Sequence, residues 1–251
     1  MPTVNFIERK PSRELSSFVE AFWQCQITEK GTIRLLPTAC SELMAYKGSQ
    51  GTGLVSIGPM SSAQLSHVMP GDLFVGARLK AGCRMDFLGR DFVDLRDSKI
   101  HGYAIDSLHI KHFETQLPNL NNLDQMEHEI EQLVEGLVHD KKILLDELVS
   151  SFIAIAEKHD GNISLTDTVA KLRLSERQFR RRFRKYTGLS PKEFLRICRQ
   201  SAAAFELKHK ERTIASVAAM GGYSDQAHFS NEFRQFVGVA PIVFEKELTL
   251  K

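Results

Sequence analysis

The sequence is poor in cysteine and in long apolar runs. Of its 251 residues only four are cysteines: Cys25, Cys40, Cys83 and Cys198. They lie far apart and never form a C-x-x-C pair, which is typical of reduced, mostly buried thiols and excludes a disulfide scaffold. No apolar stretch approaches the ~20 residues that a membrane span needs. The beginning, MPTVNFIERKPS, is charged where a secretory signal needs an apolar stretch, so we expect a cytoplasmic protein without a membrane partner.

The chain also has little net charge, +2, but the charge is unevenly distributed. Residues 162–251 contain 17 Lys and Arg against 9 Asp and Glu, whereas residues 1–161 contain 16 against 22. The front of the chain is therefore acidic and the back is basic. A basic segment joined to an acidic one indicates nucleic-acid binding at the basic end, and the alternative is a solvated basic face.

The distribution of apolar residues predicts an α+β, multidomain protein. In residues 1–115, Gly and Pro punctuate short apolar runs, which favours a small, mostly-β domain. One exception is the stretch 12–24, where apolar residues have helical spacing. Residues 116–161 are predicted to be a helical connector with one helix near 126–137 and another over 143–158. The apolar faces of these helices would serve either a dimer or packing on the first domain.

The last domain, residues 162–251, contains an internal repeat. Six residues recur at an offset of fifty: Phe179, Phe183, Arg184, Gly188, Pro191 and Phe194 reappear as Phe229, Phe233, Arg234, Gly238, Pro241 and Phe244. Matches of Phe, Gly and Pro at one offset indicate two copies of one supersecondary unit. We therefore expect an all-α domain built from two similar halves.

The first copy has the pattern of helix, tight turn, helix. Ser164 and Ser175 are good N-caps for its two helices, and Gly188 ends the second near residue 187. That second helix carries six basic residues, Arg177, Arg180, Arg181, Arg182, Arg184 and Lys185. Like charges on one helix repel one another unless a polyanion binds them, and phosphates are such a partner. A basic, solvated helix is the alternative.

The second copy follows the same plan with fewer charges. Thr213 could cap its first helix, and Ser224 or Asp225 could cap the second, over 226–237. The outward positions of the second helix are Gln226, Ser230, Asn231 and Arg234. Gln and Asn can pair bidentately with adenine. Because this helix is less basic than its twin, we expect it to contribute less electrostatic affinity.

These two units resemble the DNA-binding domain of the AraC/XylS-type transcription regulators. The second unit matches through V-A-A-M-G-G-Y-S-D-Q-A-H-F-S-N-E-F-R-Q-F-V-G-V-A-P, residues 217–241, and the likeness covers about residues 160–246. The resemblance implies a sequence-specific DNA-binding regulator and not an enzyme. Its partners would be double-stranded DNA and, if it activates transcription, RNA polymerase.

The resemblance also assigns roles to individual residues, because the second helix of each unit enters a major groove in this family. It implies base contacts from Arg177, Arg180, Arg181, Gln226, Ser230 and Asn231. Phosphate contacts would come from Arg182, Arg184, Lys185 and Arg234. Two positions depart from the family pattern, which usually has Ser at 227 and Arg at 231, where this chain has Ala227 and Asn231.

The N-terminal part resembles a poorly characterised small domain that precedes such DNA-binding domains. The matching pieces are residues 11–23, 35–43, 58–60 and 76–83. The resemblance implies a barrel-like domain for sensing or for oligomerisation, so a small-molecule effector and a second copy of the chain are candidate partners. Glu42 and Trp23 are the candidate ligand contacts. The alternative for Glu42 is a buried ion pair, and the alternative for Trp23 is an ordinary core position.

The same region has no pattern typical of an enzyme or a metal site. Residues 1–110 show no nucleophile paired with a base. His101, His109 and His112 lie close in sequence, but no carboxylate or thiolate partner stands at ligand spacing, so we predict no metal and no cofactor. The cysteines are not clustered as a zinc-held, methyl-accepting thiol would require.

Overall fold

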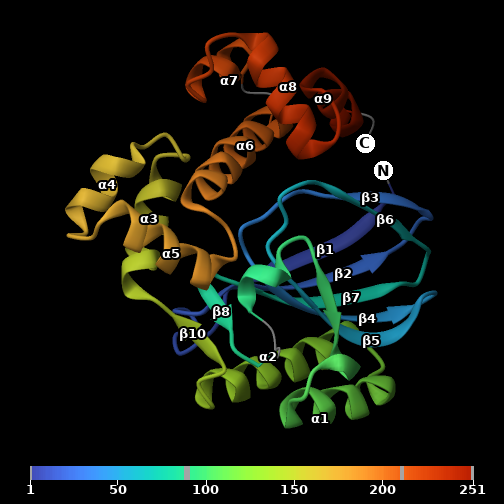
Figure 1. Ribbon diagram of the computed structural model, residues 1–251. Coiled ribbons are helices and arrows are strands. Elements are labelled where there is room, and N and C mark those ends of the chain that lie inside the picture. Colours follow the sequence, from blue (N-terminus) through green and yellow to red (C-terminus); the bar gives the residue numbers. More distant parts are fainter. Residues whose placement is uncertain (1, 88–90, 210–211, 250–251) are drawn as a thin grey trace.

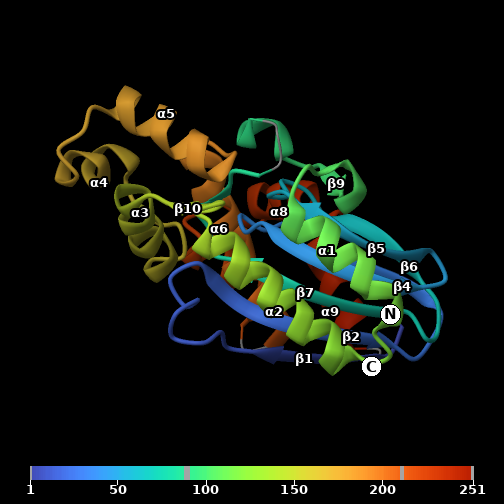
Figure 2. The same cartoon turned by 90° about the horizontal axis from the view of Figure 1, so that it is seen from below.

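A computed structural model describes residues 2–87, 91–209 and 212–249. A β-sheet forms the centre of the N-terminal part, two helices lie against one of its faces, and the C-terminal helices lie beyond the other (Figure 1). The view from below shows the same arrangement (Figure 2). The predicted order, a mostly-β part followed by helices, is confirmed.

The main sheet is antiparallel, with the strand order β1-β2-β7-β4-β5-β9. Its strands are β1 (Val4–Arg9), β2 (Val19–Ile27), β7 (Leu73–Leu79), β4 (Glu42–Gly48), β5 (Gly51–Ile57) and β9 (Lys99–His101). β1 and β9 stand at opposite edges, so the sheet does not close into the barrel that the resemblance implied. Short one-turn helices, η1 (Phe92–Leu95), η2 (Gly102–Ala104) and η3 (Leu117–Asn119), lie in the connections.

Helices α1 (Leu108–Gln116) and α2 (Leu123–His139) cover one face of this sheet. Asn122 caps α2 by accepting a hydrogen bond from the backbone N of Gln125. The apolar side of α2, including Ile130 and Val134, is buried in one core with Phe22 of β2. This side of α2 is therefore used for packing within the chain and is not free for a second copy.

The opposite face of the sheet is covered in part by a two-stranded sheet of β3 (Gly31–Leu35) and β6 (Gln64–Val68). Because side chains alternate along a strand, β2 sends Phe22 toward α2 and Trp23 toward β6, where Trp23 packs with Val68. Both faces of β2 are thus buried, which removes the simple alternation of apolar and polar residues from its sequence.

Two predicted helices are wrong in part. Residues 19–27, which overlap the stretch 12–24, form strand β2, and a β-bulge between Val19 and Ala21 shifts the phase of its apolar residues. Residues 143–158 are divided at Asp146: β10 (Ile143–Leu145) pairs with β8 (Cys83–Met85), and α3 (Glu147–Lys158) follows. The side chain of Asp146 caps α3, so the helix begins after this residue.

The C-terminal helices repeat, as predicted. They are α4 (Leu165–Lys171), α5 (Glu176–Thr187), α6 (Pro191–His209), α7 (Ile214–Met220), α8 (Gln226–Val237) and α9 (Pro241–Thr249). Ser164, Ser175, Thr213 and Asp225 all cap their helices with side-chain hydrogen bonds. Gly188 and Gly238 end α5 and α8 with φ values of 69° and 87°, a left-handed conformation that glycine adopts without strain.

Each unit has an aromatic core of its own. Phe179 and Phe183 of α5 pack against Phe152 of α3 with ring centroids 4.9 and 5.4 Å away. Phe229 and Phe233 form the equivalent core in the second unit. Helix α3 therefore packs with the first helix-turn-helix unit, and α6 joins the two units (Figure 1). Among the described helices, none has both the length and the apolar character required to traverse a bilayer.

Candidate functional site

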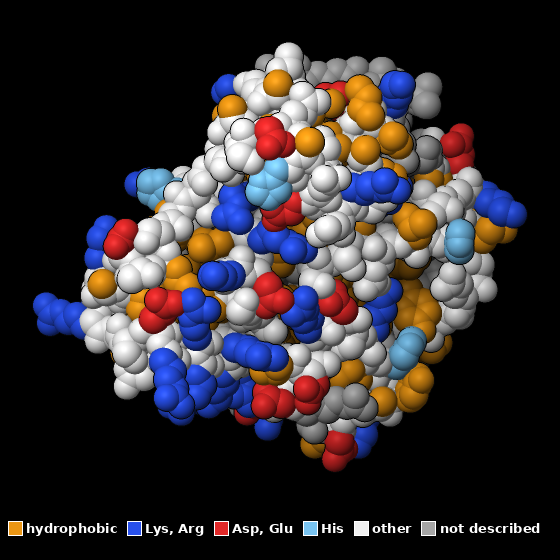
Figure 3. Space-filling view, turned by 45° about the horizontal axis from the view of Figure 1, so that its top comes forward, with side chains coloured by type: hydrophobic (Ala, Val, Ile, Leu, Met, Phe, Trp, Pro, Cys, Tyr) orange, Lys and Arg blue, Asp and Glu red, His pale blue; other side chains and the backbone are white. Residues whose placement is uncertain are grey.

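The outer face of α5 carries a concentrated positive charge. Arg177, Arg181, Arg184 and Lys185 are exposed, while Phe179 and Phe183 are fully buried on the inner side. Lys and Arg side chains gather at the lower left of the space-filling view (Figure 3). Ser175 and Gln178 form a capping box at the start of the helix, which fixes its first turn. The charges of these four side chains therefore lie on the solvent side of α5.

The other two arginines of α5 have partners within the chain. Arg180 pairs with Glu176 one turn earlier, and its hydrogen bond lowers the pKa of the Glu176 carboxyl. Arg182 donates from Nε to Oδ2 of Asp146 at 2.6 Å, and the Asp146 side chain is only 4% exposed. A phosphate contact by Arg182 would therefore compete with an existing ion pair.

The outer face of α8 is polar and nearly uncharged by comparison. Gln226, Asn231 and Arg234 are exposed, and Ser230 is half-buried. His228, also exposed, lies within 3.3 Å of the Ser224 hydroxyl through Nδ1. Arg234 occupies on α8 the position that Arg184 occupies on α5. The two outward faces thus differ in charge although their helices have the same length and the same cap positions.

Both helix-turn-helix units are held against the N-terminal part. The Nη1 of Arg34 on β3 donates to the carbonyl of Val237 at the end of α8, at 3.1 Å. The backbone N of Ala63 donates to the carbonyl of Phe236 at 2.9 Å. On the first unit, Arg96 forms an ion pair with Glu193 near the start of α6. The N-terminal part therefore contacts both the start of α6 and the end of α8.

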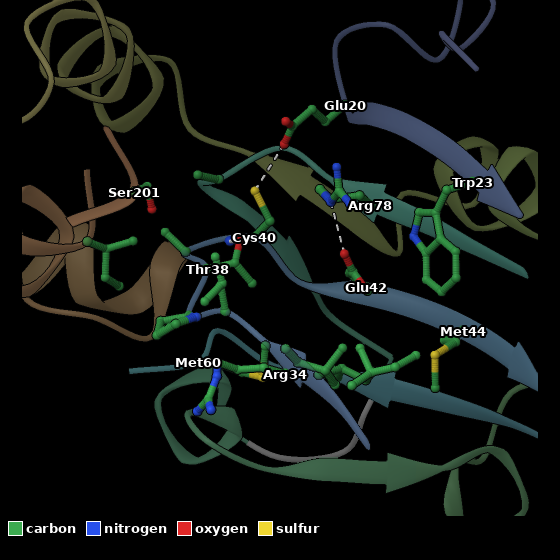
Figure 4. Close-up of a pocket in the computed structure, with 18 of the residues that line it drawn as sticks. Glu20, Trp23, Arg34, Thr38, Cys40, Glu42, Met44, Met60, Arg78 and Ser201 are labelled. Atoms are coloured by element: carbon green, nitrogen blue, oxygen red, sulfur yellow. Dashed lines mark hydrogen bonds and ion pairs between the residues drawn. The ribbon is translucent and has the colours of Figure 1, made fainter. Parts of the chain in front are cut away.

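A cavity of about 790 Å³ lies between the sheet and α6 (Figure 4). One wall comes from the strands β2, β3, β4 and β7, and the facing wall comes from Phe194, Ile197, Ser201 and Phe205 of α6. Most of the lining side chains are apolar. The size and the apolar lining are those of small-molecule sites in proteins.

Several polar groups of the cavity lie close together and are paired with one another. Arg78 donates from Nε to Glu42 at 2.9 Å and from Nη1 to Glu8 at 3.0 Å. The thiol of Cys40 donates to Glu20 at 3.1 Å, and Glu20 stands at the bulge of β2. Burial raises the pKa of Glu42, although the neighbouring Arg78 acts in the opposite direction. Burial also raises the pKa of the Cys40 thiol well above its usual value, so the thiol stays protonated.

Trp23 forms the apolar side of this cluster. Its indole lies directly over Gly76 of β7, so close that a Cβ at position 76 would overlap the ring. Phe6 stacks on the indole with ring centroids 6.1 Å apart. Trp23 is 7% exposed, and its Nε1 has no hydrogen-bond partner among the residues that the structure describes. Figure 4 shows this nitrogen turned toward the side of the cavity where Arg78 and Glu42 lie.

The structure thus brings both sequence candidates, Trp23 and Glu42, into one cavity. Sequence reasoning missed Arg78, Glu20 and the wall from α6, because they come from segments far apart in the chain. Of these, only Arg78 could have been found from a strand register, because Arg78 of β7 is the cross-strand partner of Glu42 of β4.

In the part of the chain that the structure describes, the histidines and cysteines do not gather into a metal-binding group. His109 lies 2.8 Å from a carboxylate oxygen of Asp140, and His101 stacks on Tyr103. Within the described ranges, no group of three or more His, Cys, Asp or Glu residues could hold a metal ion. Burial raises the pKa of the Cys83 and Cys198 thiols to about 12, which makes both poor nucleophiles near neutral pH.

Comparisons with known proteins agree with the sequence resemblance. Residues 168–247 match the family of the helix-turn-helix domain, and residues 7–101 match a domain of unknown function, DUF6597. An uncharacterised HTH-type transcriptional regulator of Haemophilus influenzae is 28% identical over 121 residues, 48% of this chain and 39% of that protein. The HTH-type transcriptional activator RhaR of Enterobacter is 31% identical over 104 residues, 41% of this chain and 36% of that protein.

The C-terminal part of the chain is an AraC-type helix-turn-helix domain. The chain spans less than half the length of the curated relatives named above. These relatives are described as regulators of transcription, a non-enzymatic class, as the sequence predicted for this chain. Among solved structures, ToxT from Vibrio cholerae aligns with 98% of this chain and 98% of its own, at 12% identity and a TM-score of 0.48.

Within the AraC-type domain, α5 and α8 are the second helices of the two units. The six basic residues of α5 and the polar set of α8 therefore lie on the two helices that the resemblance assigns to the major grooves. The domain has unequal halves, with the greater positive charge on the first.

Proposed function

We propose that the chain is a sequence-specific DNA-binding regulator of transcription whose α5 and α8 enter adjacent major grooves of a duplex. The observation that carries this proposal is the outer face of α5, a helix fixed by a capping box and an aromatic core. Five basic side chains are exposed there, and four of them have no ion pair in the described part of the chain. Such a face suits the phosphates of DNA and the acceptor edge of guanine. The relatives RhaR and RhaS, described as transcriptional activators, support the same role.

The proposed base contacts are Arg177, Arg180 and Arg181 on α5 and Gln226, Ser230 and Asn231 on α8. The proposed phosphate contacts are Arg182, Arg184, Lys185 and Arg234. Since Arg180 and Arg182 have acidic partners in the free chain, their DNA contacts require them to exchange Glu176 and Asp146 for the duplex. Arg177, Arg181, Arg184 and Lys185 need no such exchange, and we expect them to contribute more.

The cavity supports a second part of the proposal, a response to a small molecule through the N-terminal domain. Its walls come from the sheet and from α6, the helix that joins the two DNA-binding units. An occupant would contact both parts of the chain. Its affinity would therefore depend on the distance between α6 and the sheet. Binding of the small molecule and binding of DNA would then be coupled.

Further partners follow from this role. A regulator that acts on DNA works in the cytoplasm of a bacterial cell, and an activator would contact RNA polymerase. A homodimer would use a surface other than the apolar side of α2, which is buried against the sheet.

The test begins with selection of bound duplexes from a randomised library by the full chain. The affinity of the selected duplex is then measured by fluorescence anisotropy at several salt concentrations. Arg181→Ala should weaken specific binding by ~1–3 kcal/mol. Lys111→Ala, which removes one exposed positive charge from α1 on the far side of the sheet, is the control and should leave the affinity unchanged. The proposal fails if no duplex is enriched, or if the two variants bind it equally well.

A further inference from the structure

The cavity between the sheet and α6 has a polar cluster whose chemistry restricts what can bind there. The lining contains four acidic side chains, Glu20, Glu42, Glu157 and Asp160, and three basic ones, Arg34, Arg78 and Lys99. Arg78 is already shared between Glu42 and Glu8, at 2.9 and 3.0 Å. Its charge is therefore compensated before any ligand enters.

An anionic ligand is poorly suited to this cluster. A carboxylate placed beside Trp23 and Arg78 would also lie near Glu42 and Glu20, whose like charges would repel it. Because burial already raises the pKa of Glu42, a further negative charge nearby would be costly. The ligand that fits carries no negative charge at this end.

Trp23 indicates which polar group would fit. Its Nε1–H is buried with no acceptor among the residues that the structure describes. A buried donor without a partner costs free energy that a ligand acceptor would recover. A protonated amine has no acceptor to offer, whereas an amide or a hydroxyl has both an acceptor and a donor. The donor of such a group could bind a carboxylate oxygen of Glu42 or Glu20.

We propose that the cavity binds an uncharged, mainly apolar molecule with one polar end, such as an amide or a hydroxyl, that accepts from Trp23 and donates to the acidic cluster. The apolar body would lie between Met44 and Phe74 of the sheet and Phe194 and Phe205 of α6. This inference rests on the small-molecule response in the proposed function and names the chemical class of the effector.

The test uses the full chain and the fluorescence of Trp23, which is the only tryptophan in the sequence. The probes form two series, and within each series only the polar end differs. The first series is octanamide, octanoate and octylamine, and the second has the same three polar ends on adamantane. None of these probes absorbs light at the wavelengths that excite tryptophan. We expect the amides to change the Trp23 emission and to bind about tenfold more tightly than the matched carboxylates and amines, the difference of one good hydrogen bond.

Two variants separate the parts of the proposal, with binding measured by calorimetry. Trp23→Phe keeps an aromatic ring but removes the donor, so it should reduce the preference for the amide over the amine. Glu42→Gln leaves Arg78 less compensated, so octanoate should gain affinity relative to octanamide. Leu65→Ala, on β6 but outside the cavity lining, is the control and should bind the probes like the unaltered chain. Thermal unfolding of each variant establishes that it is folded.

The outcomes are distinct. Tighter binding of the carboxylates, no response to any of the probes, or an amide preference that survives Trp23→Phe would overturn the inference. If the chain selects a DNA duplex but fails to bind the amides, the inference on the effector fails while DNA binding stands. If the amides bind but no duplex is selected, the DNA-binding proposal fails while the chemistry of the cavity stands.

Discussion

Arg182 on α5 donates a hydrogen bond of 2.6 Å from Nε to Oδ2 of Asp146, while Oδ1 of the same carboxylate caps the first turn of α3. One buried carboxylate thus fixes the start of α3 and attaches α5 to it. A residue that we propose to contact phosphate thus also stabilises the fold. The two roles can be separated by comparing Arg182 with Arg184, which is exposed and has no ion pair in the described part of the chain.

We expect Arg182→Ala to lower the free energy of unfolding by ~1–2 kcal/mol, because it leaves the buried Asp146 carboxylate without its arginine partner. Arg184→Ala should change this free energy little but should weaken DNA binding more than Arg182→Ala. Urea unfolding and duplex titrations of both variants measure the two effects. If both variants lose the same DNA affinity and neither loses stability, the Asp146 ion pair with Arg182 does not stabilise the fold.

A second prediction concerns Gly76, which lies against the ring of Trp23. In Gly76→Ala, the added methyl group would overlap the indole of Trp23, so the ring must move. We expect a loss of ~1–3 kcal/mol in unfolding free energy and a change in the emission of Trp23. The matched control is Gly53→Ala on β5, where the new Cβ would come nearest to the hydroxyl of Tyr46, 2.9 Å away at the end of a side chain. An unchanged emission in Gly76→Ala would show that the ring does not lie over residue 76.

A third prediction concerns pH. Asp72, which is 4% exposed, accepts hydrogen bonds from the backbone N of Ser49 at 2.7 Å, from the Ser49 hydroxyl at 3.1 Å and from the backbone N of Met69 at 2.9 Å. Burial acts to raise the pKa of Asp72, but these hydrogen bonds outweigh it and hold the pKa below its usual value. The folded state therefore favours the charged form.

The stabilisation from Asp72 is present above its unfolded pKa of ~3.9 and is lost as the pH falls through the lower folded pKa. Asp72→Asn should be ~1–3 kcal/mol less stable than the unaltered chain at pH 7, because the charge on the hydrogen-bonded carboxylate is removed. The difference should shrink as the pH falls below 4. Urea unfolding at a series of pH values tests this, and a difference that grows on acidification would contradict the assignment.

The local signals of the C-terminal half were strong enough to predict its structure. Ser175 and Gly188 mark the two ends of α5 in the sequence, and both act there as a cap and a left-handed terminus. These residues work through hydrogen bonds and backbone angles within a few positions, so their effect does not depend on distant parts of the chain. The charge on the outer face of α5 could be predicted for the same reason.

The N-terminal half was less predictable because its structure depends on distant contacts. The helical spacing of Phe18, Val19 and Phe22 misled the prediction, since the bulge at Glu20 and burial of both faces of β2 hide the strand period. Trp23 and Glu42 could be singled out by their rarity and setting. The cavity that unites them could not, because it needs the strand register and the position of α6.

The inequality of α5 and α8 leads to the last prediction. Position 231 usually holds Arg in the family that the sequence resembles, and here it holds the exposed Asn231. Asn231→Arg adds a positive charge at a position proposed to lie against the bases, so it should raise the affinity for duplex DNA and steepen its dependence on salt by about one counterion. Asn231→Gln, which adds length without charge, is the control and should leave the salt dependence unchanged. Anisotropy titrations between low and moderate salt provide the measurement. If Asn231→Arg leaves the salt dependence of the selected duplex unaltered, position 231 does not lie against the DNA, and the base contact proposed for Asn231 is wrong.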